Sequence, residues 1–312
     1  MRRGNSAALG GKPGGWKVTG QLHGCGTALV TPFTSTGAVD EKALRSLVDW
    51  QIEEGIHFLV PCGSTGEAAT LTLEEHKRVV QITIEQAKGR VPIIAGAASN
   101  DTAKAIELSK HMRDLGATHL LHTSPMYNKP PQRGIVEHYR AIADAVDLPI
   151  VVYNVPGRTG SNIEAKTTLE LSKMRGIAAV KEASGNLGQI SDIIAACDGS
   201  FSVLSGDDEL TLPIMALGGD GIVSVISNAA PHAMSRLCEL IWNDDMDAAR
   251  TLHFELLPLM RGAFIESNPL PVKAALAMMG KIENRLRLPL VPMLESNNET
   301  IRSALRAAGA MS

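Results

Sequence analysis

The sequence has no excess of basic charge and no long apolar run, and these two absences exclude two classes of protein. Its 312 residues contain 30 Lys and Arg against 33 Asp and Glu, a formal net charge of −3. A nucleic-acid-binding surface needs a basic patch that neutralises phosphates, so nucleic acid is not expected as a partner. No apolar run approaches the roughly 18 residues that span a bilayer, so no membrane segment is expected.

Cysteine is also scarce, and the four cysteines at positions 25, 62, 197 and 238 are dispersed. None lies in a C-x-x-C pair or at the spacing of a Cys and His zinc site. Neither a disulfide framework nor a metal site is therefore indicated, and a reducing cytoplasm is the expected location.

Residues 1–20 differ in composition from the rest of the chain. They hold six glycines and no acidic residue, and they lack the apolar core of a secretory signal. We interpret 1–20 as a disordered leader. The patterns that follow divide the remainder into a barrel over 21–230 and a helical region over 231–312.

From residue 25 onward, short apolar and β-branched runs alternate with stretches of helical period. Helix signals between the runs include the acidic first turn at Asp40 and Glu41, and a helix over 101–115 that Gly116 ends. Eight such units indicate a closed (β/α)8 TIM barrel of the α/β class. An open doubly wound sheet is the alternative, but no G-x-G-x-x-G follows the first run. The predicted strands are 26–31, 57–61, 91–96, 118–123, 150–155, 177–181, 201–205 and 221–227.

After residue 230 the strand signals cease. Helical patterns follow at 231–242, 246–263, 271–279 and 299–308. They predict a C-terminal helical extension.

Functional side chains of such barrels lie where strands end. Lys181 ends the apolar run 177–180, where burial would lower its pKa and free the amine to attack a carbonyl. A lysine that extends to solvent is the alternative. Two of the three tyrosines, Tyr127 and Tyr153, also fall at strand ends, where they would transfer protons or simply pack with a polar tip exposed.

Other strand ends carry two hydroxyls, an arginine and two carboxylates. Ser64 and Thr65 lie between glycines that allow a ligand to approach the backbone. Arg158 matches a carboxylate ligand or is a surface charge. Asp207 and Asp208 have no third ligand nearby, and they suit the start of a helix as well as a metal pair.

Three segments together resemble the pyruvate-dependent class I aldolase and lyase family, which includes the dihydrodipicolinate synthases and the N-acetylneuraminate lyases. They are GSTGE at 63–67, YNVP at 153–156 and VKEA at 180–183, supported by 268–273. The likeness extends from about residue 26 to 305. The arginine in YNVPGRTG, residues 153–160, resembles the synthase branch, because the neuraminate lyases lack it.

The resemblance implies that Lys181 forms an imine with pyruvate and that the resulting enamine attacks L-aspartate 4-semialdehyde, with no other cofactor. The product would be 4-hydroxy-tetrahydrodipicolinate, used for lysine and diaminopimelate. Tyr153 would pass protons through Ser64 to Tyr127 of a neighbouring subunit, in a homotetramer built as a dimer of dimers. The implied substrate-binding residues are Thr65 for the pyruvate carboxylate, Arg158 for the semialdehyde, and Gly206 and Val223 near pyruvate.

Lysine-inhibited members bind the effector at a subunit interface, and the matching positions here are His76, Asn100, Lys104 and Met126. Lys104 replaces a carboxylate that would pair with the effector's amino group, and Met126 replaces a stacked ring. Because like charges repel at short range, weak or no inhibition by lysine is expected.

Two alternatives stay open. A sister lyase acting on N-acetylneuraminate or a 2-oxo sugar acid would share Lys181 and Tyr153 but would need hydroxyl-binding side chains at 157–159. A non-enzymatic barrel that binds a 2-oxo acid would form no reducible adduct with pyruvate.

Overall fold

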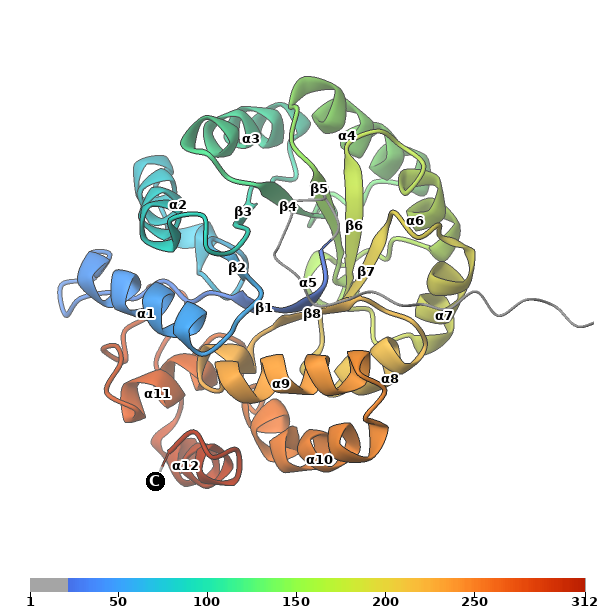
Figure 1. Ribbon diagram of the computed structural model, residues 1–312. Helices are drawn as coiled ribbons and strands as arrows, with labels where there is room; N and C mark the ends of the chain where they lie inside the picture. The colour runs from blue at the N-terminus through green and yellow to red at the C-terminus, as the bar shows by residue number, and fades with distance from the viewer. Residues whose placement is uncertain (1–21, 312) are drawn as a thin grey trace, which may run out of the picture.

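The computed structural model describes residues 22–311, so the predicted leader at 1–20 lies outside the described residues. Within that range, eight parallel strands pair in the order β2-β1-β8-β7-β6-β5-β4-β3 (Figure 1). A parallel bridge between Leu59 and Ile93 joins β2 to the residue before β3 and completes the ring. The strands are β1 Gly24–Ala28, β2 Phe58–Val60, β3 Ile94–Gly96, β4 His119–Thr123, β5 Ile150–Asn154, β6 Ile177–Glu182, β7 Ser202–Ser205 and β8 Gly221–Ser224. The predicted TIM barrel is confirmed.

A ring of helices surrounds the strands (Figure 1). One extra turn, α5 Pro156–Thr159, follows β5 directly. The other helices between strands are α1 Glu41–Glu53, α2 Leu73–Ala87, α3 Thr102–Leu115, α4 Gln132–Ala145, α6 Ala165–Leu171, α7 Leu187–Ala196 and α8 Thr211–Ala216.

Local sequence signals explain where several helices begin and end. The Asp40 side chain accepts a hydrogen bond from the Ala43 backbone N–H at the start of α1. Asp101 caps α3 in the same way, and Gly116 ends that helix with a φ of 94°. These caps satisfy backbone groups that have no partner inside the helix.

The strand predicted at 221–227 is shorter in the structure, because β8 ends at Ser224. The backbone N–H of Val225 donates to the buried Asp208 carboxylate at 3.0 Å instead of continuing the ladder. A 3₁₀ turn, η3 Ile226–Asn228, follows. The apolar residues 225–226 predict a continued strand, but the strand ends because the Asp208 carboxylate, which follows β7, binds the Val225 N–H.

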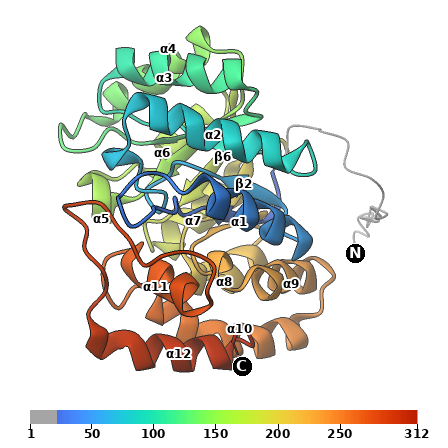
Figure 2. The same ribbon diagram turned by 90° about the vertical axis from the view of Figure 1, so that its left-hand side faces the viewer.

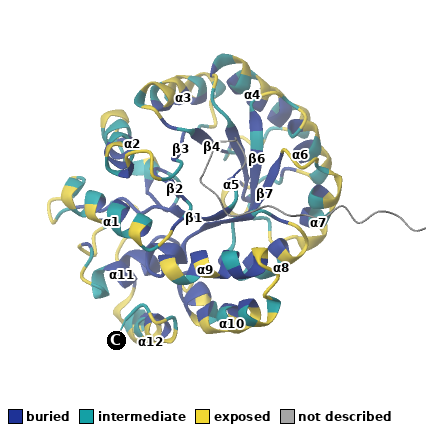
Figure 3. Cartoon of the chain, viewed as in Figure 1, coloured by how far each residue is buried: buried dark blue, intermediate teal, exposed yellow. Residues whose placement is uncertain are grey.

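Apolar side chains form two layers on either side of the strands. One cluster fills the barrel interior and includes Phe58, Val151 and Leu204, and a larger cluster lies between strands and helices. The strands are therefore buried on both faces, while the outer faces of the helices are exposed (Figure 3). Gly26 permits this interior packing, since a Cβ there would lie 1.8 Å from the Phe58 ring.

The C-terminal helices are α9 Pro231–Trp242, α10 Met246–Gly262, α11 Leu270–Met278 and α12 Asn298–Ala307. Of these, α9 packs on β1 and closes the ring of helices, while α10, α11 and α12 lie beside the barrel (Figure 2). The predicted boundary at residue 230 stays a prediction. It falls directly before α9, which packs on β1 as the eighth helix of the ring. Across residues 22–311, no helix has the length and apolar character needed to cross a membrane.

Candidate active site

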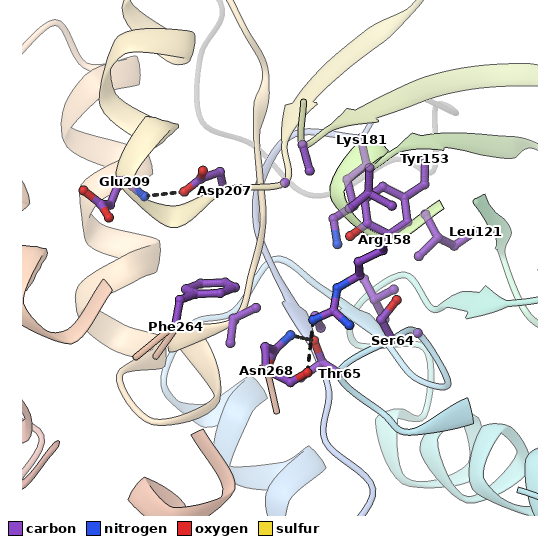
Figure 4. A pocket seen from close by; sticks show the side chains of 17 residues that line it. Ser64, Thr65, Leu121, Tyr153, Arg158, Lys181, Asp207, Glu209, Phe264 and Asn268 are labelled. Carbon is purple, nitrogen blue, oxygen red and sulfur yellow. Dashed lines mark hydrogen bonds between the residues drawn. The ribbon is translucent and has the colours of Figure 1, made fainter. Parts of the chain in front are cut away.

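A cavity of about 260 Å³ opens where the strands end (Figure 4). Its walls come from the ends of β5, β6 and β7, from the turn after β2, and from the connector between α10 and α11. Of the residues predicted to act in catalysis or substrate binding, the structure places these around it: Ser64, Thr65, Tyr153, Arg158, Lys181 and Gly206. Parallel strands bring them together because their carboxyl ends share one edge of the barrel.

Lys181 lies near the end of β6 and is only 5% exposed. It pairs in register with Tyr153 on β5, and its Nζ lies 4.1 Å from the centre of the Tyr153 ring. Burial lowers the pKa of Lys181 to about 7; the negative charge of Asp208 opposes this change and the positive charge of Arg158 adds to it. A large share of the amine is therefore unprotonated and nucleophilic near neutral pH.

Tyr153 is also buried. Burial raises the pKa of Tyr153 to about 12, against the opposing charge of Arg158. The hydroxyl therefore carries its proton at neutral pH, beside an amine that is partly free. A proton donor next to a nucleophilic amine is the pair that imine formation requires.

Gly206 provides room for the lysine side chain. A Cβ at this position would lie 2.7 Å from Ala183 Cβ and 3.0 Å from Lys181 Cε. Val223, in contrast, points into the inner barrel cluster, and the cavity is lined at this side by Val225. The proposed backbone contact of Val223 with pyruvate stays a prediction.

The turn after β2 is held by contacts that sequence reasoning did not predict. Thr65 is 3% exposed, and its Oγ1 accepts a hydrogen bond from Asn268 Nδ2 at 2.9 Å. Two residues on, Glu67 forms a fully buried ion pair with Lys273 of α11, with 2.5 Å between Oε1 and Nζ. These partners lie more than 200 residues away in the chain.

Arg158 lies on α5 at the mouth of the cavity. Its Nη2 donates to the backbone oxygen of Asn268 at 3.0 Å (Figure 4). Phe264 and Glu209 complete this side of the cavity. In the sequence, only residues 268–273 pointed to this region. They did so as part of the family resemblance, which assigned no role to Asn268.

The two carboxylates after β7 have protein partners. Asp207 accepts from the backbone N–H of Glu209, and Asp208 accepts from Ser224 Oγ at 2.5 Å. Burial raises the pKa of Asp208 to about 6. Throughout the described part of the chain, no group of three or more His, Cys, Asp and Glu side chains could hold a metal ion. Asp207 is the N-cap of the 3₁₀ turn Asp208–Leu210, in line with the helix-start interpretation, while Asp208 binds residues at the end of β8.

Tyr127 does not line the cavity of its own chain. Its side chain is 88% exposed, and its backbone has a φ of 71°. Within one chain the structure therefore does not join Tyr127 to Tyr153 and Ser64.

A second cavity of about 360 Å³ lies beside the first, and Ser64 and Tyr153 line both. Of the predicted effector residues, His76 and Met126 line it. His76 Nε2 lies 2.8 Å from the Gly96 carbonyl oxygen, and burial lowers the pKa of His76. The other two effector residues, Asn100 and Lys104, are exposed and do not line this cavity, and Asn100 Nδ2 donates to the Met126 carbonyl at 3.2 Å.

A desolvated lysine beside a protonated tyrosine, at the strand ends of a (β/α)8 barrel, defines a Schiff-base aldolase or lyase. Comparison with known proteins narrows this class. Residues 21–308 match the model of the dihydrodipicolinate synthetase family. The chain belongs to this family, which confirms the family predicted from the sequence.

Curated relatives and solved structures agree with that assignment. The chain is 54% identical to a 4-hydroxy-tetrahydrodipicolinate synthase of Koribacter versatilis over 93% of its length and 97% of the relative. It is 52% identical to the same enzyme of Syntrophobacter fumaroxidans, covering 92% and 99%. A crystal structure of a chloride-inhibited dihydrodipicolinate synthase from Acinetobacter baumannii, complexed with pyruvate, has a TM-score of 0.92 at 45% identity and covers 93% and 100%. The synthase activity predicted from the sequence, that of a lyase, is confirmed by these relatives.

Proposed function

We propose that the protein condenses pyruvate with L-aspartate 4-semialdehyde through an imine on Lys181 and yields 4-hydroxy-tetrahydrodipicolinate for lysine and diaminopimelate synthesis. The observation that carries the proposal is the buried Lys181 amine, with a pKa near 7, held 4.1 Å from the Tyr153 ring. The pyruvate bound in the Acinetobacter baumannii relative supports the first substrate.

The reaction starts with attack of the Lys181 amine on the C2 carbonyl of pyruvate. A proton passes from the amine to the oxygen as the carbinolamine forms, and Tyr153 donates a second one. The oxygen then leaves as water, and a protonated imine remains. Loss of a proton from C3 gives the enamine. C3 then attacks the aldehyde carbon of the second substrate, and the aldehyde oxygen takes up a proton and becomes the 4-hydroxyl group. The amino group of that substrate closes the ring on C2 and displaces Lys181, which restores the free amine.

Protons pass between Tyr153 and solvent through a relay. Ser64 lines both cavities together with Tyr153, which suits an intermediate position in the relay. The exposed Tyr127 serves the neighbouring subunit, since it does not reach the cavity of its own chain. A homotetramer built as a dimer of dimers would complete each site in this way.

Thr65 and Arg158 each bind the carboxylate of one substrate. Thr65 holds the carboxylate of pyruvate, near Gly206 and the backbone at Val223. Arg158, at the mouth of the cavity, takes the carboxylate of the semialdehyde in a bidentate contact. The guanidinium favours a small anionic aldehyde over a sugar-derived acceptor, whose hydroxyl groups need neutral partners.

The second cavity does not suit lysine as an inhibitor. Lys104, exposed on α3, brings a positive charge to the predicted effector residues, and Met126 lines the cavity without a ring to stack on. Inhibition by lysine is therefore weak or absent. A cytoplasmic location, expected from the scarce cysteines, stays a prediction.

One assay with purified protein tests the proposal. Pyruvate consumption is measured with L-aspartate 4-semialdehyde, and N-acetylmannosamine serves as the parallel acceptor. Borohydride trapping followed by mass spectrometry locates the pyruvate adduct, and Lys181→Met is the control that should carry none. We expect turnover with the semialdehyde and an adduct on Lys181. Trapping with turnover of another acceptor alone would retain the imine and reject the second substrate.

A further inference from the structure

Asn268, in the connector between α10 and α11, touches both groups that the proposed function assigns to the substrate carboxylates. Its side-chain Nδ2 donates to Thr65 Oγ1 at 2.9 Å. Its backbone oxygen accepts from Arg158 Nη2 at 3.0 Å. Figure 4 shows Asn268 next to Thr65, with the Arg158 guanidinium directed toward it. One residue from outside the strands therefore contacts both subsites.

The hydrogen bond from Asn268 to Thr65 determines where the hydroxyl proton of Thr65 points. A hydroxyl has one proton and two lone pairs, and the Asn268 amide occupies one lone pair of Thr65 Oγ1. Within residues 22–311 the hydroxyl proton of Thr65 has no protein acceptor. Since Thr65 is 3% exposed and lines the cavity, its free proton is available to a carboxylate bound there.

The connector that carries Asn268 is itself tethered on both sides. Glu266 Oε1 accepts from the backbone N–H of Leu294 at 2.9 Å and from Asn297 Nδ2 at 2.7 Å. On the other side, Lys273 is buried against Glu67. These contacts keep the Asn268 amide in place without involving a substrate-binding residue.

We propose that Asn268 is a positioning residue for the pyruvate subsite, because its amide turns the Thr65 hydroxyl toward the pyruvate carboxylate while its carbonyl holds Arg158 at the mouth. This inference rests on the proposed function, since it takes Thr65 as the group that binds that carboxylate. It predicts that the Asn268 side chain affects the binding of pyruvate, through Thr65, and that the Asn268 backbone oxygen affects the binding of the second substrate, through Arg158.

Two substitutions of similar shape separate this role from a structural one. Asn268→Leu removes the amide donor, but it also removes Oδ1, which is buried without a hydrogen-bond partner among the described residues. The two changes have opposite effects on the stability of the fold, so the variant should stay folded. Asn268→Asp reverses the bond, because the carboxylate would accept the Thr65 proton and would also repel pyruvate.

The experiment measures the pyruvate concentration that gives half-maximal borohydride trapping, with thermal unfolding recorded in parallel. Loss of one hydrogen bond should raise that concentration about tenfold in Asn268→Leu, and Asn268→Asp should raise it further. The KM for the semialdehyde should change less than the KM for pyruvate, because every variant keeps the backbone oxygen. Asn243→Leu, the same substitution at an exposed residue that lines neither cavity, is the matched control and should behave as wild type.

The outcomes distinguish this inference from the proposed function. Half-maximal trapping at the wild-type pyruvate concentration in both Asn268 variants would overturn the inference and leave the proposed function intact. A stronger defect in Asn268→Leu than in Asn268→Asp would overturn it as well. A wild-type protein that traps no pyruvate would reject the proposed function, and the inference with it.

Discussion

Imine formation on Lys181 should follow a single ionisation with a midpoint near pH 7. Burial of the amine lowers its pKa to about 7. At pH 8 about 90% of such an amine is unprotonated, against about 0.4% for a lysine with the ordinary pKa of about 10.4. The buried site therefore provides roughly 200-fold more nucleophile at that pH than an exposed lysine would. The rate should rise between pH 6 and pH 8 and then level off.

The assay is the rate of pyruvate adduct formation on Lys181 under limiting pyruvate, measured by cyanoborohydride trapping and mass spectrometry from pH 5.5 to 9.5. Tyr153 should not add a second ionisation, because burial raises the pKa of Tyr153 to about 12. Lys181→Met reports adducts on other lysines at each pH. A rate that still rises steeply above pH 9 would refute the desolvation argument.

A second perturbation tests the charge contribution. The positive charge of Arg158 helps to lower the pKa of Lys181. Arg158→Ala should therefore move the midpoint to higher pH. A midpoint that moves to lower pH would show that the sign of this interaction is wrong.

Four further predictions concern substrate choice, stability and regulation. Arg158→Ala should abolish most turnover with the semialdehyde in steady-state assays and still allow pyruvate trapping at saturating pyruvate, because only the second carboxylate loses its partner. Lys181→Met should stabilise the fold by about 4 kcal/mol at pH 7 in denaturant titrations. In the unfolded chain the Lys181 amine binds a proton below about pH 10, whereas in the folded protein it does so only below about pH 7. The stability gained by the substitution therefore shrinks as the pH rises toward about 10. Lys273→Met should cost about 3–5 kcal/mol, since it leaves Glu67 buried without its partner; a loss below 1 kcal/mol, the range typical of a surface pair, would contradict this. Turnover should be insensitive to submillimolar lysine, because the positive charge of Lys104 repels the amino group of the free amino acid. Inhibition at submillimolar lysine would contradict this.

Much of the fold was readable because its signals are local. A strand buried on both faces is a continuous apolar run, as in 150–153 and 177–180, and helix caps such as Asp101 act within three residues. Eight repeats of such runs with helices between them indicate a barrel, whose strand ends share one edge. The meeting of Lys181 and Tyr153 follows from that rule, since each lies near the end of its strand.

The tertiary structure alone decided which groups surround that pair. Asn268 approaches Thr65 from 203 residues away, and Lys273 reaches Glu67 from 206 residues away. No local pattern encodes such contacts, because they depend on how the C-terminal helices dock on the barrel. Burial is decided in the same way: the sequence placed a lysine at a strand end, but only the packing of β5, β6 and β7 removes water from its amine and lowers its pKa.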